Sequence, residues 1–511
     1  MNNNKAARHS REITAEGDST HFTRSMGVVE TLSLGFTYMS PLGAIAALMP
    51  FGLMTAGPPS IWWLPIVAAG QLLVALVFGE VVSQYPITGG IYPWARRLWG
   101  KRYAWLAAWI YLCALIVTIT SFTQFAVPYV GSLFGFVPSN AQGFLIVIGL
   151  LLLALAMNMG GTKTLGAVAR IGFYAEIVGV IGYGLYLLAF QRHNSVSVFF
   201  HAMGTGGGAP YSSTFLLAAL TGLFLFYGFE ACGDVAEEVR RPGRTIPRAM
   251  ILTVLCGLVS AGMAFLGFIL AAPDLQSIVD GTITTDPVSA ILDGTVGPWG
   301  TKVFLIVTLT AFLSCVLSLE AALSRLVFAF ARDEMLPGST YLSRLSKHGT
   351  PRVAMLFACA APVALSVFVL IAPNSLPRFT AFAVCGIYIC FHMVTFAALR
   401  MRFKGWRPAG DWRLGRAGFA VNVLALMWGV AAILILARPG SGDLAFLDRW
   451  IVVAGLVVVI VSGLGYMVVA RPWGRSTAPS GDALEVAERM RAARLPATAR
   501  SDDAPLSQPS Q

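Results

Sequence analysis

Long apolar runs alternate with short polar segments along almost the whole chain. A helix needs about 20 apolar residues to cross the hydrocarbon core of a bilayer. Twelve runs of roughly that length lie at residues 32–55, 63–82, 103–127, 144–159, 165–190, 214–236, 250–271, 301–330, 354–371, 379–399, 419–437 and 450–470. This pattern predicts an all-α integral membrane protein with about twelve transmembrane helices.

The basic residues between these runs predict the orientation of the chain. An even number of spans places both termini on one side of the membrane, and Lys and Arg gather in short cytoplasmic loops. The tails and loops on the side of the termini hold most of the 36 Lys and Arg residues. We therefore expect a multi-pass protein of the cytoplasmic membrane with both termini in the cytoplasm.

Composition excludes several other classes of protein. Apolar residues make up 56% of the chain and charged residues 12%, whereas a soluble domain has roughly 25% charged residues. The net charge of +11 follows from the topology, because no basic face with stacking aromatics indicates a nucleic-acid partner. The seven cysteines show no metal-ligand spacing, so we expect no metal, cofactor or disulfide.

Two of the apolar runs are interrupted near their middle. Residues 35–45 read GFTYMSPLGAI, in which Pro41 lacks a backbone donor. Residues 223–238 read LFLFYGFEACGDVAEE, in which Gly228 and Gly233 bracket Glu230. We predict that both helices unwind at these points, although each break alone is also typical of a simple kink.

The two breaks fall in the first and sixth runs, which are five spans apart. An odd offset inverts the second five-helix unit relative to the first, which is typical of inverted-repeat transporters. A membrane tolerates a discontinuous helix only where its freed backbone groups meet protein, water or a ligand. The half-helix ends offer N–H groups to a carboxylate and carbonyl groups to an ammonium or other cation. The pattern thus predicts a solute site between the breaks.

Three phrases of the sequence carry a family resemblance. They are GEVVSQYPITGGIYPWA at 79–95, GFEACGDVAEEVRRPGRTIPRAM at 228–250, and SRLVFAFARDEMLP at 324–337 followed by TPRVA at 350–354. Together they resemble the amino acid, polyamine and organocation permease superfamily over about residues 26–470. The resemblance implies a leucine-transporter-like fold of ten core helices in two inverted repeats plus two peripheral helices, which works by alternating access.

The apolar runs, the resemblance and the Ser-, Pro-, Ala- and Arg-rich composition of the tail together predict a division of the chain. The expected parts are a cytoplasmic N-terminal arm (1–25), a first five-helix repeat (26–190), a second, inverted repeat (212–400), two peripheral helices (415–470) and a disordered cytoplasmic tail (471–511). Within the tail, residues 482–495 could form one short amphipathic helix.

One departure from the family pattern bears on the substrate. Many members carry a Gly-Ser-Gly-type motif in the first span, whereas this chain has Ser40, Pro41, Leu42 and Gly43. This is more similar to the branch that includes amine, choline and aminobutyrate carriers. Because Pro41 cannot donate, a backbone cradle for a carboxylate has one N–H group fewer.

The candidate substrate-binding residues surround the two breaks. They are Tyr38, Ser40, Pro41, Leu42, Gly43, Phe224, Tyr227, Gly228, Phe229 and Glu230. Glu230 is expected to pair with a substrate ammonium, or else to be capped by freed backbone N–H groups. The aromatic rings either offer cation–π contact or simply pack. Asp234 adds a second carboxylate, unless it faces the cytoplasmic vestibule.

Glu176 and Ser314 are candidates for ion coupling. Glu176 lies on the fifth span, where the resemblance implies a lysine that replaces a sodium ion in some members. A carboxylate there could load and release a proton; the alternative is pairing with Arg170 or with a backbone donor. Ser314, Ser318 or Ser324 on the eighth span could supply hydroxyls to a cation site; the alternative is that these serines bond to the backbone of their own helix. The coupling ion is expected to be a proton, with sodium as the alternative.

The candidate gating residues lie toward the cytoplasmic side. They are Glu320 and Arg325 on the eighth span, and Glu237 and Arg248 in the mixed-charge loop after the sixth. Ion pairs in such a loop can break and re-form between two states of a transporter; the alternative is a solvated loop.

Two further ionisable residues have structural interpretations. Glu80, at the inner end of the second span and within reach of the loop that carries Arg96 and Arg97, is expected to have a structural role. His392 is expected to be a hydrogen-bonded packing residue.

The function that these features favour is transport, not enzymatic catalysis. We expect a secondary active permease that moves amino acids or related amines by proton-coupled symport, with membrane lipid as its surroundings. The alternatives are an amino acid or polyamine exchanger, a choline- or aminobutyrate-type carrier, and a nutrient receptor that keeps the permease fold without transporting.

Overall fold

The computed structural model describes residues 24–206, 210–283, 286–346, 350–371, 376–439 and 446–494. Within these ranges every regular element is a helix, and the only β-type pairing is an isolated bridge between Met26 and Val239. Eleven described helical segments are long and apolar enough to cross a membrane. The prediction of an all-α membrane fold is confirmed.

The first six spans contain the following elements: α2 (Val28–Met39), α3 (Pro41–Ala56), η1 (Pro58–Trp62), α4 (Trp63–Gln84), α5 (Ile91–Leu98), α6 (Lys101–Phe134), α7 (Asn140–Met159), α8 (Thr162–Phe190), η2 (Val196–Phe200), α9 (Tyr211–Leu225), α10 (Ala231–Asp234) and η3 (Ala236–Glu238). Two predicted spans are divided, the first into α2 and α3 and the sixth into α9 and α10.

The remaining elements are α11 (Pro242–Ala271), α12 (Leu275–Val279), α13 (Pro287–Thr295), α14 (Gly297–Arg332), α15 (Ser339–Leu342), α16 (Arg352–Ile371), α17 (Leu376–Phe403), η5 (Gly415–Ala417), α18 (Gly418–Leu436), α19 (Phe446–Arg449), α20 (Ile451–Ala470), η6 (Pro472–Gly474) and α21 (Ala483–Arg494). Six of these helices coincide with the last six predicted runs.

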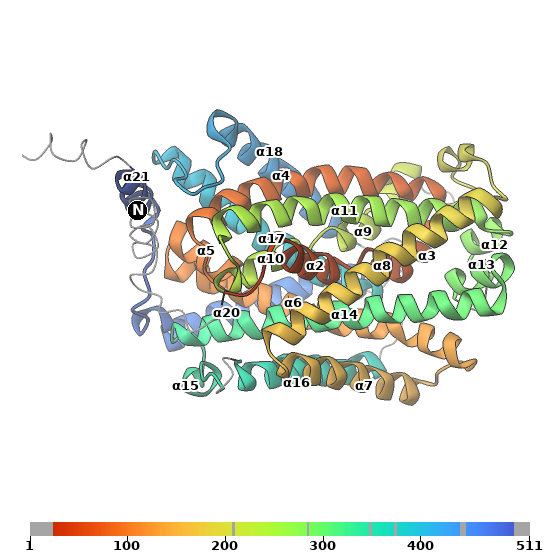
Figure 1. Cartoon of the computed structure of the whole chain (residues 1–511), viewed down its shortest axis with the longest axis horizontal. Coiled ribbons are helices and arrows are strands. Elements are labelled where there is room, and N and C mark those ends of the chain that lie inside the picture. The colour runs from red at the N-terminus through yellow and green to blue at the C-terminus, as the bar shows by residue number, and fades with distance from the viewer. Residues whose placement is uncertain are drawn as a thin grey trace, which may run out of the picture.

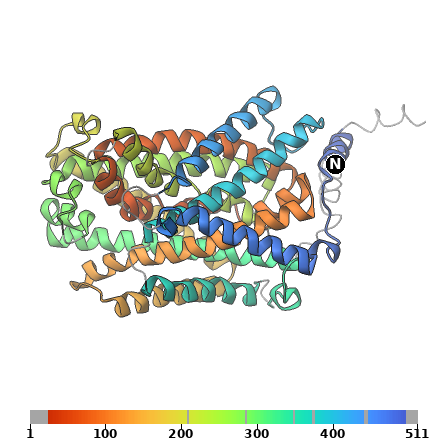
Figure 2. The ribbon, with the colours of Figure 1, turned by 180° about the vertical axis from the view of Figure 1, so that it is seen from behind.

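The long helices run roughly along the long axis of the molecule (Figure 1). Helix α21 lies at one end, and α12 and α13 lie at the other; we name these the α21 end and the α12–α13 end. The broken first span is central, with 72% of its most apolar window buried, against 28% for the α18 span and 22% for α20. Seen from behind, the blue α18 and α20 lie on the outside of the bundle (Figure 2). The apolar faces left open on these two helices suit contact with lipid.

The two broken spans run in opposite directions. The backbone N–H groups of Ser25 and Met26 both donate to the carbonyl of Glu238 at 3.0 Å, so the beginning of the first span lies beside the end of the sixth. At the other end of the molecule, the Tyr211 hydroxyl donates to the carbonyl of Ala56 at 3.0 Å. This antiparallel placement agrees with an inverted relation between the spans.

The C-terminal segment differs from the expected disordered tail. The short helix exists as α21, and the segment before it is held against the α21 end of the bundle. Gly481 N–H donates to the carbonyl of Arg96 at 3.0 Å, and Asp482 pairs with Arg97. Because these contacts are specific, disorder was the wrong prediction for residues 471–494. The N-terminal arm up to residue 23 and residues 495–511 lie outside the described residues.

Glu80 forms structural contacts, as expected, but with residues other than the loop of Arg96 and Arg97. Its carboxylate pairs with Arg402 and accepts the N–H of Leu414 at 2.7 Å. Arg96 instead pairs with Asp333. The interpretation of His392 as a packing residue agrees with the structure, because its Nδ1 lies 3.1 Å from the Thr395 hydroxyl.

Candidate functional site

The break in the first span is a single residue wide. Helix α2 ends at Met39, and Ser40 adopts a left-handed conformation with φ 40° and ψ 74°. Helix α3 begins at once with Pro41, whose fixed φ and missing N–H suit the first helical position. The predicted unwinding is therefore narrower than expected, and Leu42 and Gly43 belong to the first turn of α3.

The break in the sixth span is wider. Helix α9 ends at Leu225, and α10 begins only at Ala231. Between them Gly228 has φ 114°, a conformation that residues with a side chain rarely adopt. The glycine in the sequence thus marks the point at which the helix opens.

The structure brings the two breaks into direct contact. A Cβ atom added to Gly228 would lie 2.9 Å from the Met39 nitrogen and 2.6 Å from Cδ1 of Tyr38. The rings of Tyr38 and Tyr227 stand perpendicular with their centroids 6.3 Å apart. Backbone of one break therefore packs on backbone of the other without an intervening side chain.

Glu230 lies at this contact and is fully buried. One carboxylate oxygen accepts the N–H of Gly228 at 2.8 Å, and the other accepts the Tyr111 hydroxyl at 2.9 Å. The Tyr111 hydroxyl is in turn 3.4 Å from that of Tyr38. The sequence analysis missed Tyr111, because nothing in the uniform apolar run of α6 marks which face meets the breaks.

A second carboxylate, that of Asp234, is buried close to Glu230. It is 2% exposed, and its Oδ2 atom has no hydrogen-bond partner among the described residues. Within the described part of the chain, neither Glu230 nor Asp234 forms an ion pair with a Lys or Arg. A buried charge without a partner is costly in a membrane, so this pair of acids suits a cationic ligand.

Glu176 reaches the break of the first span from α8. One oxygen accepts the N–H of Leu42 at 2.6 Å, and the other lies 3.5 Å from the Ser40 hydroxyl. Of the two partners considered for Glu176, the structure shows the backbone donor. Arg170 instead pairs with Glu30 at 3.1 Å.

Ser314 lies on α14, which packs against α8. Its hydroxyl donates to the Ala311 carbonyl at 3.1 Å in its own helix. A Cβ atom added to Gly172 of α8 would lie 2.6 Å from this hydroxyl. Ser314 thus lines the junction of the two helices but is bonded locally.

Aromatic rings cover the contact of the breaks on two sides. Phe224 stacks on Phe122 with centroids 5.0 Å apart, and it also meets Tyr227 edge-on at 5.7 Å. Phe229 packs against Phe391 at 5.5 Å. All five rings are at most 1% exposed, so in this conformation the residues around the breaks are closed off from solvent.

Buried ion pairs close the α21 end. Arg325 Nε lies 2.9 Å from a carboxylate oxygen of Glu238, and the two side chains are 5% and 0% exposed. Beside them Glu237 lies 3.5 Å from Arg332 and accepts the N–H of Thr88 at 3.1 Å. We name the pairs Arg325–Glu238 and Arg332–Glu237 the inner ion-pair network. The sequence analysis listed Arg325 and Glu237 as gating residues but missed that Arg325 pairs with Glu238.

The other two candidate gating residues lie elsewhere. Glu320 faces α7, where the amide of Asn158 lies 3.4 Å from its carboxylate. Arg248 is exposed on α11 and forms no ion pair within the described residues. Of the four candidate gating residues, the structure brings Arg325 and Glu237 to the inner ion-pair network and places Glu320 and Arg248 outside it.

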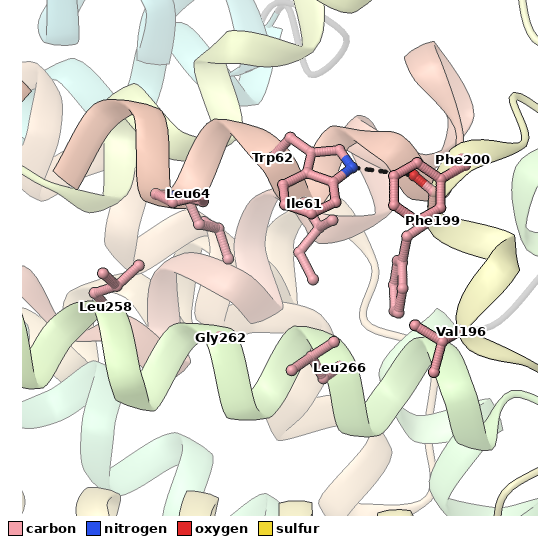
Figure 3. A pocket seen from close by; sticks show the side chains of 10 residues that line it. Ile61, Trp62, Leu64, Val196, Phe199, Phe200, Leu258, Gly262 and Leu266 are labelled. Atoms are coloured by element: carbon pink, nitrogen blue, oxygen red, sulfur yellow. Dashed lines mark hydrogen bonds between the residues drawn. The ribbon is translucent and has the colours of Figure 1, made fainter. Parts of the chain in front are cut away.

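A cavity of about 330 Å³ lies away from the breaks. It is formed by η1, the start of α4, η2 and α11. Figure 3 shows its apolar lining and the hydrogen bond from the Trp62 indole to the carbonyl of Phe199. A smaller cavity of about 130 Å³ lies between α6, α7 and α16. Neither cavity is lined by a residue of the two breaks, so neither belongs to the candidate solute site.

The known proteins that this chain resembles are permeases and transporters. A family described as amino acid permease matches residues 26–464. An uncharacterized amino-acid permease of Schizosaccharomyces pombe is 26% identical over 82% of this chain and 80% of its own length. The choline transporter of Saccharomyces cerevisiae is 24% identical over 84% of this chain and 78% of its own length. The amino-acid permease BAT1 homolog of Oryza sativa subsp. japonica is 23% identical over 92% and 98%.

Proposed function

We propose a transport mechanism for this chain, which belongs to the amino acid permease family: secondary active movement of amino acids or related amines across the cytoplasmic membrane by alternating access. The observation that carries the proposal is the contact of two broken, oppositely directed helices around the buried carboxylate of Glu230. Such a contact offers an ammonium group a charge-assisted partner in a region of low dielectric. Tyr38, Tyr227 and Phe229 would surround the solute.

The inner ion-pair network supplies the moving part of this mechanism. In the present conformation its two pairs are closed, and opening a path toward the α21 end requires them to separate. Because Lys and Arg gather in cytoplasmic loops, the α21 end is assigned to the cytoplasm. Release of the solute into the cell then coincides with rupture of these pairs.

Glu176 is the residue assigned to proton coupling. It is a buried carboxylate that contacts the junction of α2 and α3 and has no ion pair among the described residues. Loading or releasing a proton therefore changes the charge that Glu176 presents to the Ser40 hydroxyl and to the start of α3, and so biases the position of α3. Ser314, at the neighbouring junction of α8 and α14, is the candidate hydroxyl for sodium, which is the alternative coupling ion.

An amine carrier of the choline type is the second candidate function. It is favoured by the Ser40-Pro41-Leu42-Gly43 turn and by the relative that is named a choline transporter. Exchange of one solute for another would use the same site without net coupling to an ion.

Replacement of Glu230 by Gln tests the site. Glutamine removes the charge but keeps a carbonyl oxygen that can accept the Gly228 N–H, while its NH2 group can donate to the oxygen of the Tyr111 hydroxyl, so the protein should fold. A charge-assisted hydrogen bond contributes about 1.5–3 kcal/mol, so the KM for uptake into proteoliposomes should rise about ten- to a hundredfold.

Glu320→Gln is the matched control, because it also neutralises a buried carboxylate but lies against α7. Its KM should change much less. Unchanged affinity and turnover in Glu230→Gln would remove Glu230 from the site.

Replacement of Glu176 by Gln tests coupling. The amide oxygen can still accept the Leu42 N–H, but it cannot carry a proton at physiological pH. We expect uptake to lose its stimulation by an imposed proton gradient, while exchange of labelled for unlabelled solute continues. Stimulation that survives in Glu176→Gln would exclude this residue from coupling, and stimulation by a sodium gradient alone would favour the alternative ion.

A further inference from the structure

At the first turn of α3, a side chain of the protein itself already binds a backbone N–H group that could otherwise bind an anion. The N–H groups at the beginning of a helix have no partner within the helix, and together with the helix dipole they attract an anion. In α3 the first residue, Pro41, has no N–H, and the next N–H, that of Leu42, donates to Glu176 at 2.6 Å. Of the first three residues of α3, only Gly43 has an N–H group that Glu176 does not bind.

Glu176 is buried against this end of α3 and contacts it with both carboxylate oxygens. Its side chain is 1% exposed, and its second oxygen lies 3.5 Å from the hydroxyl of Ser40, the residue at the break. Whether the carboxyl group is ionised or protonated, one of its oxygens remains on the Leu42 N–H. A solute carboxylate at the same place would lose this donor and, when Glu176 is ionised, would meet a like charge in a region of low dielectric.

The side chains described at the opposite break include two carboxylates and several aromatic rings. Glu230 and Asp234 are both buried without a described Lys or Arg partner, and Asp234 has an oxygen without any hydrogen bond. The perpendicular rings of Tyr38 and Tyr227 lie at the same contact. Aromatic faces and carboxylates both attract cations. Among the described residues, the positive side chain whose charge reaches Asp234 is Arg325, and it is already paired with Glu238 at 2.9 Å, so it is not available to an anionic solute group.

We infer that the transported solute is an organic cation that carries an ammonium group and no free α-carboxylate. Glu176 takes the place of the solute carboxylate at the start of α3, and Glu230 with Asp234 balances the ammonium charge. The inference rests on the proposed transport function and narrows its substrate class from amino acids and amines to amines. It also makes Glu176 a residue that determines specificity, in addition to its assigned role in coupling.

Matched compounds test this inference on the full-length protein in proteoliposomes. An amino acid, its methyl ester and its decarboxylated amine share an ammonium group and a side chain and differ in the carboxylate. Sets built on small, aliphatic, aromatic and basic side chains are compared by uptake and by stabilisation of the purified protein against heat. We expect the esters and amines to be preferred at least tenfold over the parent amino acids.

Two variants of Glu176 distinguish its effect on substrate specificity from its role in proton coupling. Glu176→Ala frees the Leu42 N–H and should reduce or reverse the preference by at least tenfold, measured as a ratio of apparent affinities. Glu176→Gln keeps an oxygen on that N–H and should retain the preference, as should Glu320→Gln. The heat-stabilisation measurement needs no ion gradient, so loss of coupling does not affect it.

The outcomes distinguish the inference from the proposed function. Wild-type protein that transports the amino acids as well as or better than their amines would overturn the inference and leave the transport function standing. A preference that is unchanged in Glu176→Ala would overturn the assigned role of Glu176. If no compound of any set is transported or stabilises the protein, both the inference and the proposed function are wrong. Wild-type preferences decide the main question even if the Ala variant does not fold.

Discussion

Replacement of Gly228 by Ala should abolish solute uptake and strongly destabilise the protein. The residue has φ 114°, which costs a side-chain-bearing residue about 1–3 kcal/mol. The added Cβ would also lie 2.9 Å from the nitrogen and 3.0 Å from the Cα of Met39. Because these are backbone atoms, they cannot rotate away, and overpacking adds about 1–3 kcal/mol. The two breaks would have to separate at the candidate solute site.

Gly182→Ala provides the matched control for this substitution. Gly182 lies in the interior of α8, and a Cβ atom there would meet nothing within 4 Å. Alanine in a helix interior is favoured over glycine by roughly 0.5–1 kcal/mol, so this variant should be as stable as wild type or more stable. Thermal unfolding in detergent and uptake in proteoliposomes measure both variants. Equal behaviour of Gly228→Ala and Gly182→Ala would disprove the close contact of the breaks.

Removal of Arg325 should cost nearly as much stability. Its partner Glu238 is 0% exposed, and breaking a buried ion pair by removing one member costs about 3–5 kcal/mol, because a charge is left buried and unpaired. Arg170→Ala is the control, since the pair of Arg170 and Glu30 is 45% and 29% exposed. An exposed pair contributes about 0–1 kcal/mol.

A double-mutant cycle on Arg325 and Glu238 measures their coupling directly. We expect Arg325→Met combined with Glu238→Leu to be more stable than Arg325→Ala alone, because no charge is left unpaired. The free energy of unfolding in mixed micelles is the measured quantity. If Arg325→Ala and Arg170→Ala lose equal stability, the buried pair does not hold the α21 end closed.

The membrane spans and both breaks could be predicted from the sequence because their causes are local. The length of an apolar run is set by the thickness of the bilayer, and the long helices of the structure coincide with the predicted runs. Pro41 removes a donor from the backbone, and Gly228 permits a positive φ, whatever surrounds them. Even so, the sequence predicted a longer unwound segment in the first span than the structure has, because the break is confined to Ser40.

The partners of the charged residues could not be predicted in the same way. The span pattern places Glu80 within reach of the loop of Arg96 and Arg97, yet its partner Arg402 is 322 residues away. The tail was expected to be disordered because its composition is polar, but Asp482 is held by Arg97, 385 residues away. In each case the decisive neighbour lies on a helix whose position depends on the packing of the whole bundle.

The sequence by itself determined that this chain crosses a membrane many times, that two of its helices are discontinuous, and that buried carboxylates accompany them. Run length and backbone chemistry suffice for that. Only the tertiary structure decided what each carboxylate faces. Glu176 meets the N–H of Leu42 across 134 residues of chain, and Tyr111 meets Glu230 across 119. Helix packing fixes these distances, because it alone selects which face of α8 and of α6 turns toward the breaks.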